Sequence, residues 1–512
     1  MYMRLTPSFS IALAALLALA ANLAHSQDSG IIGLGIPETV RAGSPLDLPN
    51  EATSNGLFMT ILWDIKDSGG TGATLSGNTF RATDTGTATL TATFIDTINS
   101  DVPVKQFSAS AVHTAAIKED GTLWTWGDNW VGQLGLGTWD AYYKEPIRII
   151  TTPDLTWATV SAGGYWEAHY ANYWDPYNHY YYTIALTTDG ALWAWGDNRD
   201  GQLGIGDDQP QVTTHPLPIP GDNDWAAISA HTHTVALKTN GTLWAWGDNR
   251  DGQLGDGTTT SQNKPKQIIS EGSNDWATVT AGFSCTLAIK TNGTLWAWGN
   301  NWAGQLGDGS KTNCRSPQKI GTDTDWLAVA PGFAHTIALK ANGTLYAWGN
   351  NSSGAFGNNT RLDSDVPLQI GGDEDWVAIA AGGNGDFDGG DTGNGICNYT
   401  VALKADGTLW AWGDNTYYQL GDGTTDSHIE PNQVGTDTNW ATISTTSVFV
   451  MASKTDGSLW AWGHNYEGQL GDGTTAPSPI PGQVNKFFGI ETLFTQDFPL
   501  RVIPAGTVLI IR

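Results

Sequence analysis

Basic residues, cysteine and methionine are all scarce in this sequence, and each scarcity argues against a class of protein. Lys and Arg number 24 against 51 Asp and Glu, which gives a formal net charge of -27. The basic face of a nucleic-acid-binding protein is therefore not expected. The low Met count of 4, beside 63 Gly and 25 Trp, points away from long helices. It favours many short strands joined by tight turns.

Cysteine occurs at three positions, Cys285, Cys314 and Cys397, whose spacings fit neither a zinc site nor a redox motif. Because the number is odd, one thiol stays unpaired. A disulfide between Cys285 and Cys314 is one interpretation in an oxidising compartment. The alternative is three unbridged thiols, buried or half-buried.

Long apolar runs are absent beyond the amino terminus. There, Arg4 is followed by a small and aliphatic stretch over residues 11–21 and by the small-residue cleavage site Ala24-His25-Ser26. The stretch is well short of the roughly 20 residues that span a bilayer. Residues 1–26 are therefore predicted to be a secretory signal peptide rather than an uncleaved anchor. We expect an extracytoplasmic protein (secreted, periplasmic or on the cell surface) with no membrane span after cleavage.

One unit recurs seven times between residues 107 and 483, with a basic length near 51 residues. Its most constant part reads Gly-Thr-Leu-Trp-Thr-Trp-Gly-Asp-Asn over residues 121–129, followed by Gly-Gln-Leu-Gly over residues 132–135. A unit of this length holds about four short strands. The Asp-Gly or Asn-Gly pair before each Leu-Trp strand predicts a hairpin with both central residues at positive φ.

The strand Leu-Trp-Ala-Trp over residues 295–298 is apolar on both faces, which requires a sheet packed between two others. The outer strand of each unit is expected to contain Pro, as at Pro265 and Pro431, because an edge strand need not donate every ladder bond. A closed ring satisfies these requirements without polar caps. The predicted fold is all-β, a seven-bladed β-propeller over residues 105–484, with the two chain ends completing one shared blade.

The constant residues are interpreted as structural rather than catalytic, because seven identical turns explain them better than seven active sites. Gly127 and its equivalents admit a special backbone conformation, and Asn129 and its equivalents bond the backbone of their own loop. The tryptophans are expected to be wedged between blades. This predicted set comprises Trp126, Gly127, Asn129, Trp195, Trp246, Trp298, Trp348, Trp412 and Trp462.

The repeated pattern, Ala-Gly, His-Thr before an Ala-Leu strand, Asp-Gly-x-Leu-Trp-x-Trp-Gly-x-Asn and Gly-Gln-Leu-Gly, resembles the regulator of chromosome condensation repeat. The resemblance covers about three quarters of the chain. It implies a seven-bladed propeller that serves as a protein-interaction platform. The nuclear type promotes nucleotide exchange on a small GTPase and docks on chromatin, and exported bacterial members exist. The signal peptide and the acidity depart from the nuclear type.

Residues 30–104 lack the repeat and contain a strictly alternating run over residues 87–94, typical of a half-buried antiparallel strand. This segment resembles bacterial immunoglobulin-like modules, which implies a small β-sandwich. The tail, residues 485–512, contains two strand-like apolar pieces. It is expected either to cover the propeller or to pair with the N-terminal module.

His113, His233 and His335 occupy equivalent positions in their repeats, where other copies have Tyr182, Cys285, Tyr399 and Phe449. Packed or hydrogen-bonded side chains are favoured over metal ligands, because equivalent positions lie around a ring too wide for one metal. We find no nucleophile, zinc-protease, phosphate-loop or dinucleotide motif. A non-enzymatic protein is therefore expected.

Two insertions, in the second and sixth repeats, fall between the Ala-Gly and the next strand and so emerge on the same rim. The first concentrates aromatic side chains, which give a large contact area with few rotatable bonds. Its alternative interpretation is a self-packed lid. The predicted partner-binding residues are Tyr165, Trp166, Tyr170, Tyr173, Trp174, Tyr177 and Tyr180.

The second insertion matches the first half of a calcium loop but has Gly395 where the bidentate Glu should stand. No cofactor is expected unless Ca²⁺ binds here. A flexible acidic loop is the alternative. The candidate metal ligands are Asn384, Asp386, Asp388 and Asp391.

These observations favour an exported, non-catalytic propeller that binds a protein partner through its rim loops. The first alternative is a carbohydrate or cell-wall lectin using the same aromatics. The second is an enzyme with paired carboxylates or a metal at the mouth of the central channel. Nucleotide-exchange activity is implied only by the family resemblance. Neither nucleic acid nor a membrane is an expected partner.

Overall fold

The computed structural model describes residues 102–485 except 140–141, 152–154, 166–179, 207–209, 271–273 and 386–395. It also describes the backbone of strands between residues 39 and 98 and of residues 489–503. The chain divides into two compact units, one of residues 1–100 with 488–512 and one of residues 101–487. In the described part, no helix has the length and apolar character needed to cross a membrane.

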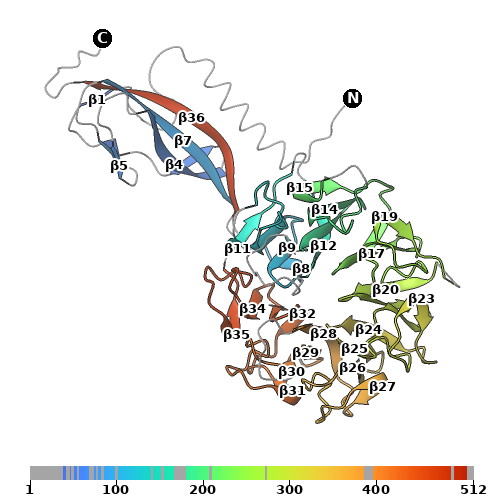
Figure 1. The fold of residues 1–512 in the computed structure, drawn as a ribbon. Coiled ribbons are helices and arrows are strands. Elements are labelled where there is room, and N and C mark those ends of the chain that lie inside the picture. Colours follow the sequence, from blue (N-terminus) through green and yellow to red (C-terminus); the bar gives the residue numbers. More distant parts are fainter. Residues whose placement is uncertain are drawn as a thin grey trace. The chain divides into compact units, whose positions relative to one another are not determined.

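The second unit consists of seven four-stranded antiparallel sheets arranged as blades around a ring (Figure 1). Within each blade the strands follow one another in chain order. Blade 1 contains β8 (Val104–Ala109), β9 (His113–Lys118), β10 (Leu123–Asp128) and β11 (Tyr142–Arg148). Blade 2 contains β12 (Trp157–Gly163), β13 (Tyr182–Thr187), β14 (Leu192–Asp197) and β15 (Val212–Pro218). Blade 3 contains β16 (Trp225–Ala230), β17 (His233–Lys238), β18 (Leu243–Gly247) and β19 (Gln262–Gln267).

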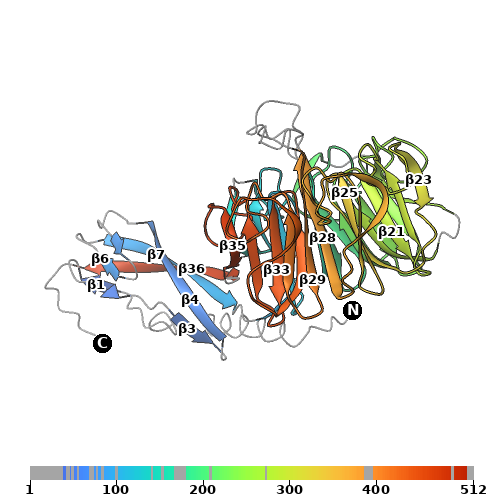
Figure 2. The same cartoon turned by 90° about the horizontal axis from the view of Figure 1, so that it is seen from below.

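The remaining four blades repeat this order (Figures 1 and 2). Blade 4 has β20 (Trp276–Ala281), β21 (Cys285–Lys290), β22 (Leu295–Gly299) and β23 (Cys314–Lys319). Blade 5 has β24 (Trp326–Pro331), β25 (His335–Lys340), β26 (Leu345–Gly349) and β27 (Ser364–Ile370). Blade 6 has β28 (Trp376–Gly385), β29 (Ile396–Lys404), β30 (Leu409–Gly413) and β31 (His428–Gln433). Blade 7 has β32 (Trp440–Thr445), β33 (Phe449–Lys454), β34 (Leu459–Gly463) and β35 (Ser478–Gln483).

The predicted propeller is confirmed, but the predicted closure by a shared blade is wrong. Blade 1 is complete within its own strands from β8 to β11, and blade 7 within β32 to β35. The sequence interpretation missed β11 as the outer strand of the first copy and placed the start of that copy too late. Closure instead rests on packing, because Phe107 and Trp126 of blade 1 share one core cluster with Phe449 and Leu470 of blade 7.

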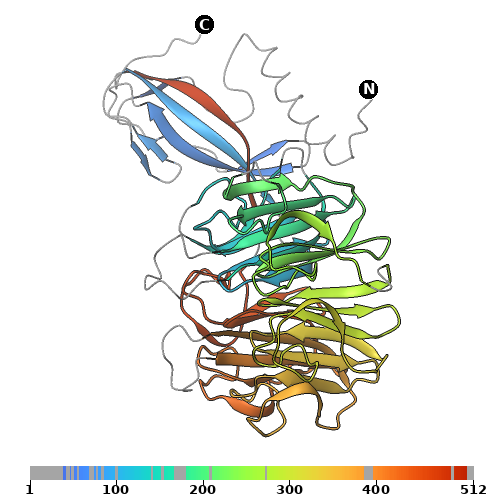
Figure 3. The same cartoon turned by 45° about the vertical axis from the view of Figure 1, so that its right-hand side comes forward.

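The tryptophans that were expected between blades are buried. Most of their indoles make the same hydrogen bond to the preceding blade, so the junctions between blades resemble one another. Trp126, for example, is 0% exposed and donates from Nε1 to the carbonyl oxygen of Gln469 in the preceding blade at 2.9 Å. Thr114 Oγ1 donates to the same carbonyl at 3.1 Å. Equivalent Trp donors at blades 2, 4, 5, 6 and 7 reach the matching carbonyl of the preceding blade. Each such junction is thus a copy of the same contact, and Figure 3 shows the sheets of the ring from another side.

The constant glycines and asparagines have the structural roles predicted for them, with one refinement. Gly127 has φ +98°, and a Cβ at this position would collide with the carbonyl oxygen of Val112. Asn129 accepts a bond from the backbone of Leu134 at 3.1 Å and donates to the carbonyl of Thr138 at 3.0 Å. The Asn therefore spans its whole loop instead of closing a local Asx turn.

The hairpin between the second and third strands also differs from the prediction. Gly121 has φ +81°, whereas Asp120 is not among the described non-glycine residues at positive φ. The backbone N–H of Gly121 donates to the carbonyl of Lys118 at 2.9 Å, and Asp120 accepts from the backbone of Thr122 at 2.9 Å. This is a three-residue loop with glycine in the left-handed region rather than a two-residue turn.

The hairpin ends of blades 3 to 7 each hold a lysine between two aromatic rings, an arrangement that we call a lysine cage. Lys290 is 4% exposed in its side chain and pairs with Asp275 at 2.9 Å. Its Nζ lies 4.8 Å from the ring centroid of Trp276 and 4.7 Å from that of Trp296. Cages with two rings recur around Lys238, Lys340, Lys404 and Lys454.

The first unit contains a five-stranded sheet in the order β1-β36-β7-β4-β3 and a three-stranded sheet in the order β2-β6-β5. Strand β7 (Gly86–Ile98) pairs antiparallel with β36 (Gly489–Ile503). The tail therefore pairs with the N-terminal module, one of its two expected positions. The other strands are β1 (Thr39–Arg41), β2 (Leu46–Asp47), β3 (Glu51–Ser54), β4 (Leu57–Asp67), β5 (Thr74–Ser76) and β6 (Thr79–Arg81). The immunoglobulin-like sandwich stays a prediction, and the signal peptide, residues 1–26, lies outside the described residues.

The cysteines are unbridged, which decides between the two interpretations of the sequence. All three are free. Cys285 and Cys314 both lie opposite Gly299, one on each side of β22. Two strand spacings of roughly 4.8 Å separate their backbones, which exceeds the Cα–Cα distance that a disulfide can bridge.

Candidate binding surface on the loop rim

The propeller has two rims, and the connections divide cleanly between them. We call the rim that carries the connections between first and second strands and between third and fourth strands the loop rim. The opposite rim, with the hairpins and the lysine cages, is the hairpin rim. Both insertions leave the ring on the loop rim, because one joins β12 to β13 and the other joins β28 to β29. The prediction that they share a rim is confirmed.

The aromatic insertion has a defined neck. Of its seven predicted anchors, only Tyr165 and Tyr180 belong to the described residues. Their rings stack with centroids 4.7 Å apart at an interplanar angle of 8°, and the backbone N–H of Tyr180 donates to the carbonyl of Tyr165 at 3.1 Å. The two ends of the insertion are thus held together. The other five anchors, Trp166, Tyr170, Tyr173, Trp174 and Tyr177, lie outside the described residues.

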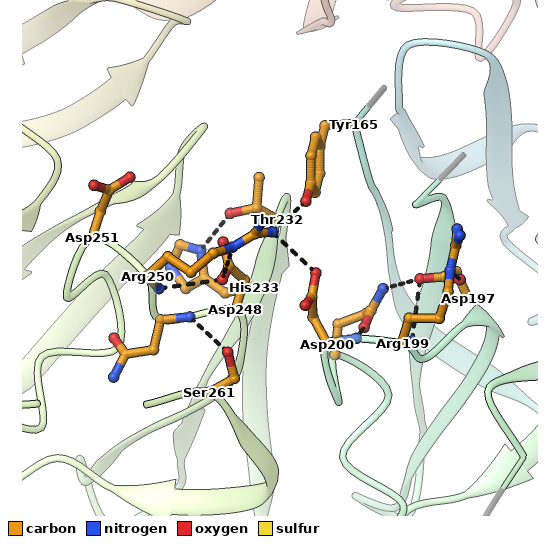
Figure 4. A network of polar contacts seen from close by, with 12 residues as sticks. Tyr165, Asp197, Arg199, Asp200, Thr232, His233, Asp248, Arg250, Asp251 and Ser261 are labelled. Atoms are coloured by element: carbon orange, nitrogen blue, oxygen red, sulfur yellow. Dashed lines mark hydrogen bonds and ion pairs between the residues drawn. The ribbon is translucent and has the colours of Figure 1, made fainter. Parts of the chain in front are cut away.

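Two arginines that the sequence interpretation missed support this neck. Arg250 donates from Nη2 to the Tyr165 hydroxyl at 2.6 Å (Figure 4). The Arg199 guanidinium lies 4.2 Å from the ring centroid of Tyr180. Asp248 holds the Nε of Arg250 at 2.8 Å. The only signal in the sequence was their position, because both arginines directly follow the constant Asn of their loops.

Further aromatic side chains continue from the neck along the first-to-second-strand turns of blades 3, 4 and 5. Phe283 contacts Tyr165 edge-to-face with centroids 5.9 Å apart and His231 at 5.8 Å. Phe333 of the next blade follows at 4.5 Å. Phe283 and Phe333 are half-buried, as is Tyr165. An arc of rings therefore leads from the first insertion toward blade 6, which carries the second.

The position after the constant Asn varies in its side chain from repeat to repeat. Its backbone N–H bonds the side chain two residues earlier, as Arg250 bonds Asp248 at 3.2 Å and Trp302 bonds Asn300 at 3.3 Å. This turn fixes the backbone and projects the side chain from the rim. The seven residues at this position are Trp130, Arg199, Arg250, Trp302, Ser352, Thr416 and Tyr466.

Three of these side chains are large aromatics open to solvent: Trp130 is 40% exposed, Trp302 46% and Tyr466 61%. Among the described residues, the only other large exposed aromatics are Trp139 and Tyr142, which belong to the loop after β10 and the start of β11 and so also face the loop rim. Among the described residues of this unit, the most exposed aromatic side chains therefore all lie on one rim. Trp, Tyr and Arg are the residue types that dominate the energetics of interfaces.

Burial and acidic side chains on the loop rim raise the pKa values of two neighbouring groups. Asp128, buried beside the loop of blade 7, has its pKa raised well above the ordinary range by burial and by the nearby Glu467. Burial, followed by Asp200, also raises the pKa of Tyr165, so its hydroxyl stays protonated at all physiological pH values. It can therefore accept from Arg250 without becoming a second charge.

The predicted calcium ligands are only partly within the described residues. Asn384 is buried and lies in β28, where its backbone is paired with Cys397 of β29. Its Oδ1 has no hydrogen-bond partner among the described atoms. Asp386, Asp388 and Asp391 lie outside the described residues. Within the described part, no group of three or more acidic, His or Cys side chains is arranged to hold a metal.

The three equivalent histidines are packed between blades, as expected. His113 and His233 are 0% exposed, and their Nε2 atoms lie 2.9 and 2.7 Å from Thr183 and Thr286 of the following blade. Burial lowers the pKa of both imidazoles to about 3. They are neutral in the fold and serve as hydrogen-bonding spacers.

The strands nearest the ring axis offer little for catalysis. Their sequences contain Ala, Thr, Ser and branched aliphatic residues, and the one charged side chain in these seven described strands is Lys105. Leu327 and Val377 are the large apolar side chains exposed there. The paired carboxylates that would mark an active site in the channel are not present on these described strands.

Family models for the regulator of chromosome condensation repeat match the chain along most of the propeller. One model matches residues 120–166, 189–237, 240–289, 292–339, 406–452 and 456–492, and a second matches residues 104–133, 327–360 and 376–419. The chain belongs to this repeat family. Membership agrees with the seven four-stranded blades and with the constant Trp, Gly and Asn of each copy.

Curated relatives from this family resemble part of the chain. The ultraviolet-B receptor UVR8 of Arabidopsis thaliana is 32% identical over 220 residues, which is 43% of this chain and 46% of the relative. The probable E3 ubiquitin-protein ligase HERC3 of Homo sapiens is 29% identical over 219 residues, 42% of this chain and 19% of the relative. The alignments thus span less than half the length of these relatives.

Solved structures share the fold at low sequence identity. Prp20p of Saccharomyces cerevisiae, described for its binding to Gsp1p and histones, has a TM-score of 0.60 and 18% identity over 80% of this chain and 94% of that one. Human WBSCR16 has a TM-score of 0.59 and 20% identity over 71% of this chain and 94% of that one. Yeast RCC1 bound to Kap60 is similar at a TM-score of 0.59 and 18% identity, covering 79% of this chain and 90% of that one.

Proposed function

We propose that this protein is an exported, non-catalytic platform that binds another protein through the loop rim. The observation that carries the proposal is that the most exposed aromatic side chains among the described residues lie on that rim, with Trp130, Trp302 and Tyr466 projected from equivalent turns. Export rests on the signal-peptide pattern at residues 1–26. Relatives whose descriptions name bound proteins, such as yeast RCC1 with Kap60, support a protein partner.

The neck of the first insertion strengthens the proposal. A binding loop whose ends are fixed loses less conformational freedom when it binds, so more of its contact energy appears as affinity. Tyr165 and Tyr180 supply this fixation, and Arg199 and Arg250 hold the two rings from outside. A calcium ion in the second insertion stays a prediction that would add rigidity on the same rim.

The test is capture of partners from the native cell surface by the full chain, compared with two variants. One lacks residues 166–179, and the other carries W130A, W302A and Y466A. We expect both variants to capture less protein while keeping the unfolding midpoint of the parent. A matched control, V366A with L368A on the outer strand β27, removes exposed apolar area away from the rim. An equal loss of protein capture by the control variant would contradict a rim-specific site. Binding of the full chain to glycan arrays but not to proteins would favour the lectin alternative.

A further inference from the structure

The loop rim combines aromatic faces with an excess of negative charge. The whole chain has a formal net charge of -27. The two arginines at the variable rim position are already matched by carboxylates: Arg199 contacts Asp197, and Arg250 contacts both Asp248 at 2.8 Å and Asp200 at 3.3 Å. These cations therefore do not make the rim attractive to an acidic ligand.

Acidic side chains occur in the loops that carry the exposed indoles or bond to those loops. Asp251 accepts a hydrogen bond at 2.8 Å from Asn313, a residue of the same loop that projects Trp302. Trp130 follows two residues after Asp128, a buried carboxyl that interacts with Glu467 of blade 7. Both exposed indoles thus belong to loops that contain or contact acidic side chains.

On the hairpin rim, aromatic rings combined with a carboxylate hold a lysine of the same chain. In each lysine cage an ammonium group sits between two aromatic rings and is capped by an Asp, as Lys290 is by Trp276, Trp296 and Asp275. Ring faces carry negative potential that attracts cations, and carboxylates add to it. On the hairpin rim, lysines of this chain already occupy the ring faces of the cages. On the loop rim, the rings of Trp130 and Trp302 are exposed to solvent.

We infer that the loop rim binds a polypeptide segment bearing Lys or Arg, whose cationic side chains lie on the faces of Trp130 and Trp302 beside the rim carboxylates. This inference rests on the proposed function and specifies the chemistry of the partner. Long-range attraction by the acidic chain would steer such a segment to the protein. The exposed aromatic faces would then select the loop rim over the hairpin rim, where the rings of the lysine cages already contact lysines of this chain.

The probe is a 20-residue peptide of alternating Lys and Ala, and its control replaces every Lys with Gln. Titration of the full chain by calorimetry is expected to show binding of the Lys peptide only, weakened by added salt. W130A with W302A should weaken binding about tenfold, the loss expected for two exposed cation–π contacts. V366A with L368A should leave it unchanged, because those side chains lie on the outer strand β27.

Equal affinity of the Lys peptide for the double Trp variant would show attraction to charge alone and would overturn the inference. Self-association of the full chain that is lost in the same variant would also overturn it, because the rim would then be occupied by a second copy. If rim variants reduce capture from cell surfaces while the Lys peptide does not bind, the proposed function stands and only this inference fails. If neither capture nor peptide binding depends on the rim, both fail.

Discussion

Arg250 donates a hydrogen bond from Nη2 to the Tyr165 hydroxyl at 2.6 Å and thereby joins the loop of blade 3 to the insertion of blade 2. The contact fixes one side of the neck, the Tyr165–Tyr180 pair between which the predicted binding loop runs in the sequence. Because Arg250 also touches Asp248 and Asp200, it organises both the charge and the aromatic stack at this point of the rim.

R250Q should therefore loosen the neck without unfolding the propeller. We expect faster amide hydrogen exchange at Tyr180, whose N–H bonds Tyr165, and a loss of about 0.5 kcal/mol in the free energy of unfolding, since the Arg is half exposed. Y165F removes the same hydrogen bond but keeps the ring stack, so its exchange rate should lie between those of R250Q and the parent. Unchanged exchange in R250Q would show that the stack alone holds the neck.

The indole donors between blades offer a matched comparison. W298F removes the bond from Nε1 to the carbonyl of Gln253, whereas Trp246 is equally buried but its Nε1 has no partner among the described atoms. W298F and W246F create a similar cavity. W298F should therefore lower the free energy of unfolding by about 1 kcal/mol more than W246F, the value of one hydrogen bond. Urea unfolding of the two variants checks this. W126F, at the junction of the chain ends, should resemble W298F.

The lysine cages should contribute measurably to stability. K290M removes a buried ammonium from between Trp276 and Trp296, and we expect a loss of about 2 kcal/mol in the free energy of unfolding. Asp275 stays partly exposed and can be hydrated when its partner is gone. K319M, on the outer strand β23, provides the exposed control and should change stability by less than about 0.5 kcal/mol. Similar losses in both would refute a special role for the cage.

Asp128 is predicted to oppose folding at neutral pH, because burial and Glu467 raise its pKa above that of the unfolded chain. A raised carboxyl pKa means that the folded state binds the proton more tightly, so stability falls as pH rises from about 4. D128N should stabilise the fold by about 1 kcal/mol at pH 7, and the gain should shrink toward pH 4. Asn300 already holds the equivalent place and accepts from Gln305 at 2.9 Å.

D248N is the contrasting variant, measured by the same unfolding titrations. Asp248 pairs with Arg250 at 2.8 Å, so loss of its charge should destabilise the fold rather than stabilise it. If both substitutions shift stability in the same direction, burial of the Asp128 carboxyl is not the dominant factor.

The buried histidines should make the fold sensitive to acid. Burial lowers the pKa of His335 to about 4, below the 6.5 of an unfolded imidazole, so its contribution is present above pH 6.5 and is lost as pH falls toward 4. At pH 5 the loss amounts to about 2 kcal/mol for one such group.

H335Y should remove this part of the pH dependence. Tyr182 and Tyr399 occupy the equivalent positions, and Gly332 lies against His335 as Gly382 lies against Tyr399, so the larger ring has a precedent for its space. Unfolding midpoints of parent and variant at pH 5 and 7.5 decide the matter. An unchanged pH dependence in H335Y would assign the acid sensitivity to other groups.

The repeat made the propeller predictable because each Trp, Gly and Asn occupies the same place in every blade. The shared rim of the insertions followed from strand alternation alone. Contacts between blades were not predictable in the same way, because the Gln carbonyl that receives Trp126 belongs to the preceding copy and a backbone acceptor leaves no mark in the side-chain pattern. The lysine cages were overlooked although Lys290 and its equivalents stand three residues before the turn glycine in every repeat except the second, which has Thr187.

Closure and the neck were missed for a related reason. Predicting whether the two chain ends share a blade requires every strand to be recognised in the sequence. Strand β11 was missed because its charged and aromatic residues do not alternate between polar and apolar. Arg199 and Arg250 acquire their importance only through Tyr180 and Tyr165, which lie in another part of the chain. Five of the seven predicted anchors stay predictions, since they lie outside the described residues.

The pairing of β7 with β36 has a consequence for the seam between blades 1 and 7. The ladder begins at Ile98 and Gly489, a few residues before the ring starts and a few after it ends. While this ladder stays paired, the chain segments that lead into and out of the ring are held together. The pairing thereby keeps the effective concentration of blades 1 and 7 at their seam high.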